Sequence, residues 1–464
     1  MFVRLGHRGL IAAAIAFVLF AAVGSPASAG AKSSPIQHVV VLYLENHSFD
    51  NVFGYWCDQH PGRCPDGGMP KRVKLMGGTV VTPTVAPDTV PAASHSVEAQ
   101  VAAVDGGKMD GWANVFGCQA STKYACISGY KPSQIPNITT LAKDFAISDN
   151  TFSMANSPSW AGHLYAALAS LDGFLGDLPI AASGVAPGPG WGCNSDLVAQ
   201  WAPSLGAPSQ LVPSCVPDPS LDPTQYPNGG AFESSPVTYA PSIFDRLHAA
   251  GLSWRIYDGN KNEASGGWAI CPSLAECWDT RQRSNELSVD HFVSNAAAGN
   301  LPNFSIITPG GKYTLDSEHN GNSMTAGDNW VGQIAHDIMT SPEWSSTALF
   351  ITYDDCGCFF DQVPPGLNPD GTAQGPRSPL VIVSPYARPG YTDTTHTTFA
   401  GILAYVEHTF KLASLGPNDA GAYPFSDAFN YSQSPLKPVH MVKRRLPASA
   451  RKIRLTSAML KDPS

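Results

Sequence analysis

The stretch QHVVVLYLENHSFDNVFG, residues 37–54, decides the fold. Its first half, residues 38–44, is a run of β-branched and other apolar residues, which is typical of a strand buried on both faces of a parallel sheet. The run stops at Glu45 and Asn46, where a strand more often gives way to Gly, Pro or Ser. Because sites on open α/β sheets lie at the carboxyl ends of the strands, the stretch predicts a functional site at residues 45–46.

Similar short apolar runs recur along the chain and alternate with helical patterns. The runs lie at 144–148, 252–257, 303–308, 347–353 and 379–384, and the helical patterns at 160–172, 240–251, 326–341 and 397–413. Alternating strands and helices predict an α/β sandwich with crossover connections. The stretches 57–95 and 176–240 are rich in Pro, Gly and Ser, and we expect them to form disulfide-pinned insertions that cap the sheet.

The composition indicates a folded, exported protein. The chain has 464 residues, of which 43% are hydrophobic and 14% charged, enough to bury a large core. At the N-terminus, Arg4 and Arg8 precede a short apolar run that ends in the small residues Ala27–Ala29. This pattern predicts a signal peptide, residues 1–29, and a secreted or periplasmic location; a transmembrane anchor is the alternative, but the run of about 15 residues is short for a span.

The body of the chain is acidic, whereas its C-terminal tail is basic. Without residues 1–29, Lys plus Arg falls from 28 to 26 against 37 Asp plus Glu, a formal net charge of −11. So acidic a body argues against a nucleic acid partner. The segment 437–464 carries eight Lys or Arg and one Asp. We expect one domain at 30–436 and a basic tail at 437–464 that is solvated and loosely docked, with contact to an anionic surface as the alternative.

Ten cysteines fit an exported chain with disulfides. Their spacing favours four local pairs, with Cys356 and Cys358 left over. The four predicted pairs are Cys57–Cys64, Cys118–Cys126, Cys193–Cys215 and Cys271–Cys277. A metal–thiolate site is the competing reading, although the chain holds no CxxC pair. A disulfide between Cys356 and Cys358 would close a very short loop, so each thiol could instead pair elsewhere.

A second strand ends as the first does. In ALFITYDDCGCFFDQVPPG, residues 348–366, the apolar run stops at Asp354 and Asp355. Two strands thus bring Glu45, Asn46, Asp354 and Asp355 to one sheet edge, where three carboxylates repel one another unless a cation lies among them. Carboxylate and amide oxygens suit Mg²⁺, Ca²⁺ or Mn²⁺ and tolerate Zn²⁺. For a single such residue, a helix N-cap or an Asx-turn is the simpler interpretation.

A nucleophile candidate stands at the start of a helical pattern. In NSPSWAGHLYAALAS, residues 156–170, Ser159 lies where backbone N–H groups and the helix dipole favour an anion. His163 follows four residues later on the same face. His95 and His319 lie in polar loops and could contact phosphoryl oxygens, as could Lys108; each alone is more often a surface residue, and Ser159 alone is more often an ordinary N-cap.

Taken together, these motifs resemble a known family. HVVVLYLENHSFDNVFG is similar to the opening signature of the bacterial phosphoesterases that include phospholipases C and acid phosphatases, within the alkaline phosphatase-like superfamily. SHSVEAQVAAVDGGKMDGW, SPSWAGHLY, LDSEHNGNSMTAGDNWVGQIAHDIMTSPEW, TALFITYDDCGCFFDQVPP and HTTFAGILAYVEHTF resemble later blocks of that family, in order. The resemblance covers about residues 36–413. It implies a three-layer α/β/α sandwich with a mostly parallel central sheet.

The resemblance also implies roles for single residues. The implied metal ligands are Glu45, Asn46, Ser159, Asp354 and Asp355. Ser159 is also the nucleophile, His95 and His319 face the phosphate, and His163 lies near the site. The chain departs from the family at four places. Asp355 stands for a glutamate, Cys358 for a glycine, Gln362 for a histidine and Gly162 for an asparagine.

These observations predict a metal-dependent hydrolase of phosphoric esters that works through a phosphoserine and one divalent ion. The compact chain favours a broad-range acid phosphatase over a phospholipase C, so its partner would be a small phosphate ester or a phospholipid. A serine esterase would need a Gly-x-Ser-x-Gly elbow, which the chain lacks. The changes at Gln362 and Gly162 leave a secreted binding protein with a decayed site as the alternative of another class.

Overall fold

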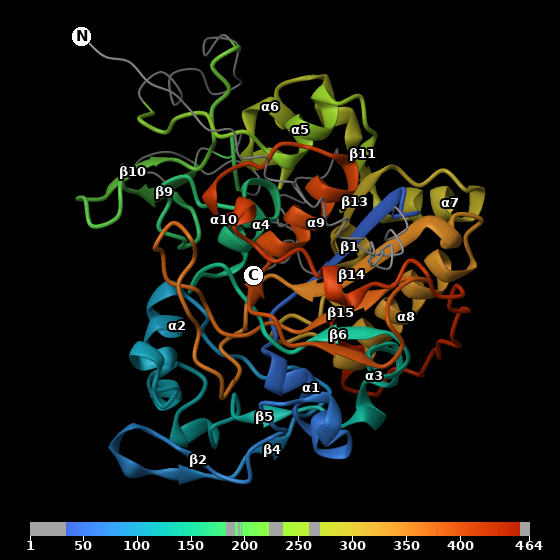
Figure 1. The fold of residues 1–464 in the computed structure, drawn as a ribbon. Helices are drawn as coiled ribbons and strands as arrows, with labels where there is room; N and C mark the ends of the chain where they lie inside the picture. Colours follow the sequence, from blue (N-terminus) through green and yellow to red (C-terminus); the bar gives the residue numbers. More distant parts are fainter. Residues whose placement is uncertain are drawn as a thin grey trace, which may run out of the picture.

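A computed structural model describes residues 34–181, 191–193, 195, 197–221, 235–258 and 270–454. The predicted signal peptide lies outside these residues, as does the end of the tail. The described part is built around one large sheet with helices on both faces (Figure 1). Among the described residues, no helix combines the length and the apolar character that a membrane crossing requires.

The central sheet has eight strands, in the order β12-β11-β13-β1-β14-β15-β6-β16. Their bounds are β12 Glu286–Ser288, β11 Trp254–Asp258, β13 Phe304–Ile307, β1 His38–Leu44, β14 Thr347–Tyr353, β15 Leu380–Val383, β6 Ala146–Ser148 and β16 Tyr391–Asp393. All six predicted strands belong to this sheet. The sequence did not predict β12 and β16, two three-residue strands at the edges.

The sheet is parallel except at one strand. β1 pairs in parallel with β13 and β14, whereas β15 runs antiparallel to both β14 and β6. The predicted mostly parallel sheet is therefore confirmed. Residues Val39 to Leu44 of the central strand β1 are at most 1% exposed, so their apolar run has helices on both faces. Each such fully buried aliphatic side chain contributes roughly 1.5–3 kcal/mol relative to an exposed one.

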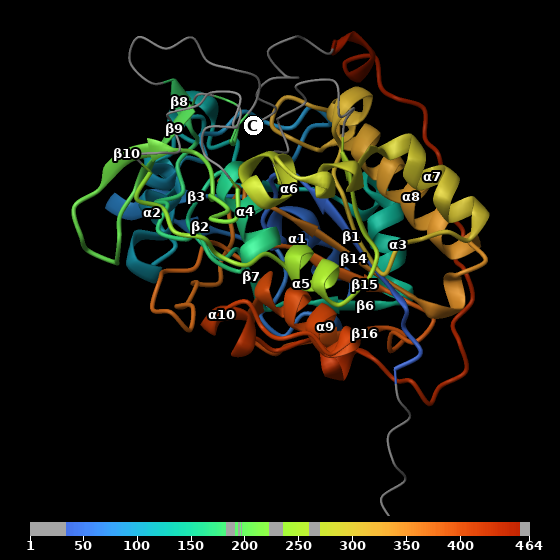
Figure 2. The ribbon, with the colours of Figure 1, turned by 90° about the horizontal axis from the view of Figure 1, so that it is seen from above.

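Helices cover the two faces of the sheet. On one side lie α3 Pro136–Asp144, α7 Val289–Ala298 and α8 Met324–Thr340; on the other lie α4 Ser159–Leu168, α5 Ile243–Ala249 and α9 Ala400–Phe410 (Figures 1 and 2). The four predicted helices correspond to α4, α5, α8 and α9. The three layers confirm the predicted α/β/α sandwich.

Two short helices connect the sheet to the insertions. α1, Phe49–Gln59, follows β1 directly, and its N-cap Ser48 accepts a hydrogen bond from the Asn51 amide at 3.3 Å. α2, Val97–Val104, follows the His95 loop, with Ser96 as its N-cap. Neither helix was predicted from the sequence. Together they hold the two loops that flank the carboxyl end of β1.

The insertions form small sheets pinned by disulfides. β2 Val73–Lys74 pairs with β3 Val80–Val81, and β4 Thr84–Val85 pairs with β5 Ser128–Gly129. β8 Ile180–Ala181, β9 Leu197–Trp201 and β10 Gln210–Pro213 form a three-stranded sheet. All four predicted disulfides are present, and Cys356 and Cys358 are free and buried.

The basic tail is docked more closely than the sequence predicted. Side-chain amides of Asn137 and Asn329, from α3 and α8, act as partners for its backbone. Asn137 donates to the Val442 carbonyl at 2.9 Å and accepts from the Val442 amide at 2.8 Å. Asn329 pairs in the same way with Arg444, at 2.8 Å in both directions. The domain boundary at residue 436 stays a prediction.

Candidate functional site

The polar side chains at the ends of β1 and β14 lie beside each other because the two strands pair in parallel register. Leu44 pairs with Tyr353, so Glu45 and Asp354 follow at the same level of the sheet. The Asp354 amide donates to the Leu44 carbonyl at 3.0 Å, which extends the pairing by one step. Sheet register therefore brings together the two strand ends that the sequence singled out, and their polar side chains are buried.

Asn46 turns the chain sharply as it leaves β1. Its φ is 87°, a left-handed conformation that asparagine tolerates better than most residues. The turn lets the 355–358 loop pack directly on it: a Cβ at Gly357 would lie 2.3 Å from the Asn46 carbonyl oxygen. In the same loop, the amides of Asp355 and Gly357 donate to Asp354 Oδ1 at 2.8 Å and to Asp355 Oδ1 at 2.5 Å. These contacts fix the carboxylates beside the Asn46 amide.

Helix α4 brings Ser159 and His163 to the same place. Ser159 is the first residue of the helix and is fully buried. His163, one turn later, places Nε2 3.8 Å from Asp354 Oδ2. The contact is close at Gly162, where an added Cβ would lie 3.0 Å from both Cβ and the carbonyl oxygen of Asp354. The Tyr43 hydroxyl donates to the Gly162 carbonyl at 2.9 Å and so ties α4 to β1.

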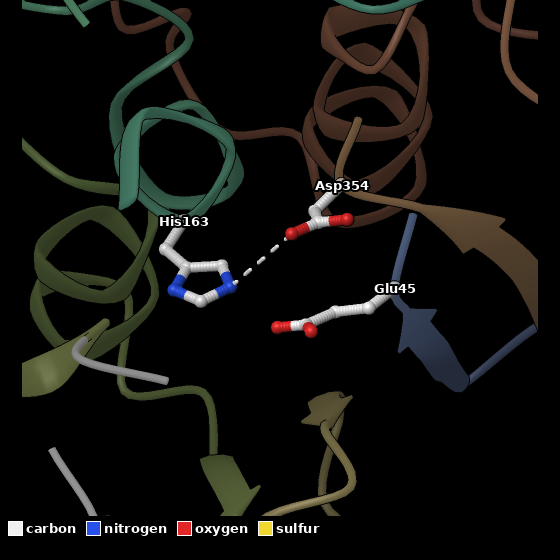
Figure 3. Close-up of side chains that lie close together, drawn as sticks. All are labelled: Glu45, His163 and Asp354. Atoms are coloured by element: carbon white, nitrogen blue, oxygen red, sulfur yellow. Dashed lines mark ion pairs between the residues drawn. The ribbon is translucent and has the colours of Figure 1, made fainter. Parts of the chain in front are cut away.

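Glu45, His163 and Asp354 form a possible metal site. Each offers a ligand atom, and these atoms all lie within 4.8 Å of one another, with all three residues buried. Figure 3 shows the three side chains converging from β1, α4 and the end of β14. Glu45 and Asp354 were predicted as ligands from the sequence, whereas His163 was predicted only to lie near the site. Its spacing from Ser159 indicated the correct face of α4 but not the carboxylate that it meets.

The Asn46 amide lies between the carboxylates and two histidines. One of the two terminal atoms of this amide lies 2.9 Å from Asp354 Oδ1 and 3.2 and 3.3 Å from the two Asp355 oxygens. The other terminal atom lies 3.1 Å from His319 Nε2 and 3.3 Å from His95 Nε2. The protons on the neighbouring groups decide which of the two atoms is the oxygen.

The two histidines favour the amide nitrogen on their side. His95 Nδ1 lies 3.2 Å from the Ala93 carbonyl, and His319 Nδ1 lies 2.9 Å from the Asn320 carbonyl, so each Nδ1 carries the proton. In a neutral ring Nε2 is then an acceptor, and burial lowers the pKa of His319 to about 3. The Asn46 NH₂ group donates to both rings, which points its oxygen at the oxygens of Asp354 and Asp355.

This group of oxygens, with the His163 ring beside it, fits a divalent cation. Burial raises the pKa of Asp354 well above its ordinary range, and Asp355 raises it further, while the Ser159 hydroxyl lowers it. Burial also raises the pKa of Asp355 to about 8. The cluster needs protons or a cation to offset its charge, and carboxylate and amide oxygens are ligands of hard divalent ions. The residues present therefore fit the group that the sequence predicted.

His163 and Glu45 fit the same interpretation. Burial lowers the pKa of His163 to about 3, so the ring is neutral and can offer a lone pair. Glu45 Oε2 lies 3.7 Å from His319 Nε2. Gln100 holds the two loops around these groups, because its side chain donates to the carbonyls of His95 and Ser157 at 2.8 and 2.7 Å. The loop that carries His95 is thereby tied to the segment that leads into Ser159.

Sequence reasoning missed the residues that support His319. Glu318, the residue before it, has φ 68° and is buried. The Tyr353 hydroxyl donates to Glu318 Oε2 at 2.6 Å, and His47 Nε2 lies 3.0 Å from the Glu318 carbonyl oxygen. The only sequence signal was adjacency to His319, since the partners come from the ends of β1 and β14.

Gln362 and Lys108, which the sequence also singled out, lie outside the cluster formed by Glu45, Asp354 and Asp355. The side-chain Nε2 of Gln362 donates to the Gly68 carbonyl at 3.0 Å, and its backbone N–H donates to Asp50 Oδ2 at 2.9 Å. It thus borders a buried ion pair in which Arg377 lies 3.0 Å from Asp50. Lys108 is mostly exposed and pairs with Asp105 at 2.8 Å, so the structure does not bring it into the site.

The sequence of this chain matches a known family. The model of the phosphoesterase family matches residues 36–413, most of the chain. The chain belongs to the phosphoesterase family. It is a hydrolase that acts on phosphoric ester bonds, as the sequence predicted, and this family is generally metal-dependent.

The similar relatives share a name. The chain is 24% identical over 447 residues to non-specific phospholipase C6 of Arabidopsis thaliana, covering 87% of this chain and 74% of that protein. It is 25% identical over 456 residues to non-hemolytic phospholipase C of Pseudomonas aeruginosa, covering 87% of this chain and 58% of that protein. A solved protein of the alkaline phosphatase superfamily from Vibrio parahaemolyticus matches with a TM-score of 0.34 and 12% identity, over 76% of this chain and 70% of that one.

Proposed function

We infer that this phosphoesterase is a phospholipase C-type enzyme that cleaves the phosphodiester of a phospholipid headgroup, with Ser159 as nucleophile. The observation that carries the chemistry is the group of buried carboxylates and the Asn46 amide beside the first residue of α4. The relatives named phospholipase C, matched over most of this chain, support the substrate class. This choice revises the acid phosphatase that the sequence favoured.

The proposed reaction has two steps. A bound divalent ion, held by Glu45, Asn46, Asp354 and Asp355, supplies Lewis acidity to the serine oxygen and the phosphoryl oxygens. Ser159 Oγ attacks phosphorus, the bond to the lipid alcohol breaks, and the phosphorylated headgroup stays on the serine as a phosphodiester, while the proton lost by the serine hydroxyl is balanced by the one that the departing alcohol gains. Water then releases the phosphorylated headgroup. The backbone N–H groups at the start of α4 stabilise charge on the phosphoryl oxygens.

The histidines orient groups in this proposal rather than act as acids. Burial lowers the pKa of both His163 and His319 to about 3, and a cation nearby would lower it further. Neutral imidazoles accept hydrogen bonds, which matches the orientation assigned to the Asn46 amide. An acid optimum would need a protonated imidazole to donate to the leaving group, and the lowered pKa values of His163 and His319 do not favour one, which weakens the acid phosphatase alternative.

The test compares diester and monoester substrates on one protein. We expect hydrolysis of p-nitrophenyl phosphorylcholine and of phosphatidylcholine vesicles at a higher kcat/KM than p-nitrophenyl phosphate, with the metal content of the protein measured by elemental analysis. Ser159→Ala should lower kcat on the order of 10³-fold or more with unchanged folding. Ser305→Ala is the matched control, because it removes a buried hydroxyl from the middle of β13.

Two outcomes would contradict the proposal. A clear preference for p-nitrophenyl phosphate would establish the broad-range phosphatase instead. A folded parent protein that hydrolyses neither substrate with Mg²⁺, Ca²⁺, Mn²⁺ or Zn²⁺ would support the binding protein with a decayed site.

A further inference from the structure

The small sheet of β8, β9 and β10 has one face packed against the protein. In the antiparallel pairing of β9 with β10, Leu211 lies opposite Gln200 and Val212 lies opposite Ala199. Because successive side chains of a strand point to opposite faces, these two pairs lie on opposite sides of the sheet. Ala199, Val212 and Trp201 are at most 7% exposed, so their side is the buried one.

The opposite face of this sheet is exposed and yet apolar. Leu211 is 51% exposed, and Ile180, which pairs with Val198 on the same side, is 55% exposed. Leu175, whose amide donates to the Gln200 carbonyl at 2.9 Å, is 45% exposed. The solvated face of an antiparallel sheet normally carries polar side chains, so this face departs from the usual alternation.

The loop between β9 and β10 continues the apolar surface. Leu205 in this loop is 80% exposed. Residues 197–217 contain no Asp, Glu, Lys, Arg or His, in a chain with 37 acidic and 28 basic residues. Asp177 accepts a hydrogen bond from the Val97 amide at 3.2 Å, so its carboxylate faces the start of α2. We call the exposed residues the cap surface: Leu175, Ile180, Leu205 and Leu211.

The cap surface adjoins the segment that carries the proposed nucleophile. Phe174 packs edge-on against Trp160, with ring centroids 5.0 Å apart. On the other side of Leu175, a Cβ at Gly176 would lie 2.9 Å from Ser157 Cβ. β9 and β10 project at one side of the molecule (Figures 1 and 2). A partner bound to the cap surface would therefore lie close to the start of α4.

The chemistry of the cap surface fits a lipid bilayer. A stable protein interface uses about 20–30 residues a side with a hydrogen-bonding rim, whereas the cap surface is a few aliphatic side chains on an uncharged hairpin. Interfacial proteins bury such side chains roughly 5–10 Å deep at the boundary between headgroups and acyl chains. The formal net charge of −9 gives no attraction to anionic lipid, which leaves apolar insertion as the source of binding.

We propose that the cap surface inserts into the interface of a zwitterionic phospholipid bilayer and holds the enzyme there while a headgroup enters the site. The membrane contact stands on the exposed apolar residues alone. Its consequence for catalysis rests on the proposed function, so binding and hydrolysis are measured separately.

Binding is measured with Ser159→Ala, so that the vesicles stay intact. We expect this protein to sediment with phosphatidylcholine vesicles, equally at about 0.1 and about 0.5 M NaCl, since salt screens charges and not apolar contacts. Adding Leu205→Asp and Leu211→Asp should weaken binding at least about tenfold, because binding scales with the apolar area inserted. Val80→Asp is the matched control: Val80 is 52% exposed in β3 of another insertion, and its loss should leave binding unchanged.

Catalysis is measured with Ser159 restored. The variant with both Leu205→Asp and Leu211→Asp should hydrolyse phosphatidylcholine vesicles at least about tenfold more slowly than the parent at limiting lipid. Its kcat/KM for soluble p-nitrophenyl phosphorylcholine should equal that of the parent, because this diester needs the catalytic site and not the cap surface.

Four results would overturn the membrane contact. They are a parent that stays in solution beside the vesicles, binding that salt abolishes, equal losses on vesicles and on the soluble diester, and a parent dimer that the double substitution dissociates without any vesicle binding. The last result would assign the cap surface to a second copy of the chain. A parent that hydrolyses neither substrate would contradict the proposed function, while sedimentation would still decide the membrane contact.

Discussion

Asn46 combines a backbone constraint with a ligand role at a single residue. Its φ of 87° lets the chain turn away from β1, and its amide faces Asp354, Asp355 and two histidines. A substitution at this position therefore changes two properties at once. Two different substitutions can separate them, because glycine tolerates left-handed backbone and alanine does not.

We expect Asn46→Gly to preserve stability without metal but to bind a divalent ion ten- to a hundredfold more weakly. Asn46→Ala should show the same loss of affinity and also unfold more easily, by about 1–2 kcal/mol, from the strained backbone. Urea unfolding with chelator, and then with Mn²⁺, measures both effects. Equal Mn²⁺ affinity in the parent and both variants would contradict the ligand role of the amide.

At the scale of elements, α4 packs closely against the end of β14 because Gly162 has no side chain. Gly162 faces the backbone of Asp354, and the Tyr43 hydroxyl bonds to its carbonyl. The position of Ser159 and His163 relative to the carboxylates thus depends on how closely two elements pack.

We expect Gly162→Ala to lower kcat/KM at least tenfold and to cost roughly 1–3 kcal/mol of stability, since the added Cβ pushes α4 from Asp354. Gly332→Ala in α8 is the matched control. Its Cβ would lie 2.6 Å from Asn137 Nδ2, on the face that holds the tail. It should cost similar stability with unchanged kcat/KM in steady-state assays. Equal activity losses in both variants would argue against a specific role of the α4 contact.

The contact between α6 and the start of α5 should make the stability of the protein depend on pH. Glu276, in α6 Ala275–Trp278, accepts a hydrogen bond from Ser242, the N-cap of α5. Burial raises the pKa of the Glu276 carboxyl to about 7 from its ordinary 4.5. The folded state therefore holds the proton more tightly than the unfolded state. The resulting stability is complete below about pH 4.5 and is lost as the pH rises through 7.

We expect the parent to lose about 3 kcal/mol relative to Glu276→Gln between pH 4.5 and 8, because glutamine stays neutral throughout. Unfolding free energies of both proteins at matched pH values give this difference, in which the titration of other groups cancels. A difference that does not change with pH would contradict the raised pKa.

At the scale of the whole molecule, the tail fastens α3 to α8. Asn137 and Asn329 each form two hydrogen bonds with tail backbone, and Arg444 pairs with the buried Asp328 at 3.2 Å. None of these groups touches the carboxylate cluster. The tail should therefore affect stability and not catalysis.

We expect a chain that ends at Leu436 to unfold more easily by roughly 2–4 kcal/mol, about 1 kcal/mol for each lost hydrogen bond, with unchanged kcat/KM. Asn329→Ala should show about half of this loss. Urea unfolding and activity assays on both variants test the prediction. A loss of activity at full stability would instead give the tail a role in substrate binding.

The parts of this molecule that could be predicted from sequence are those set by local pattern. Continuous apolar runs gave the six inner strands, polar residues at two strand ends gave the carboxylate cluster, and short spacing gave the disulfides. The edge strands β12 and β16 are three residues long, too short for a pattern. The antiparallel direction of β15, the contact of His163 with Asp354 and the support of Glu318 by Tyr353 depend on packing between distant segments.

The place of β1 in the sheet has a consequence for how the protein is made. Val39 pairs with Phe304 and with Ala348, so the strand that leaves the ribosome first must wait for both of its neighbours. During translation the apolar segment of β1 has neither neighbouring strand to pair with. Such an exposed segment is prone to aggregation and is a substrate for chaperones. Truncated nascent chains should remain protease-sensitive and inactive until the codons of β14 have been read. The catalytic site can therefore form only late in synthesis, because its Asp354 and Asp355 carboxylates follow β14.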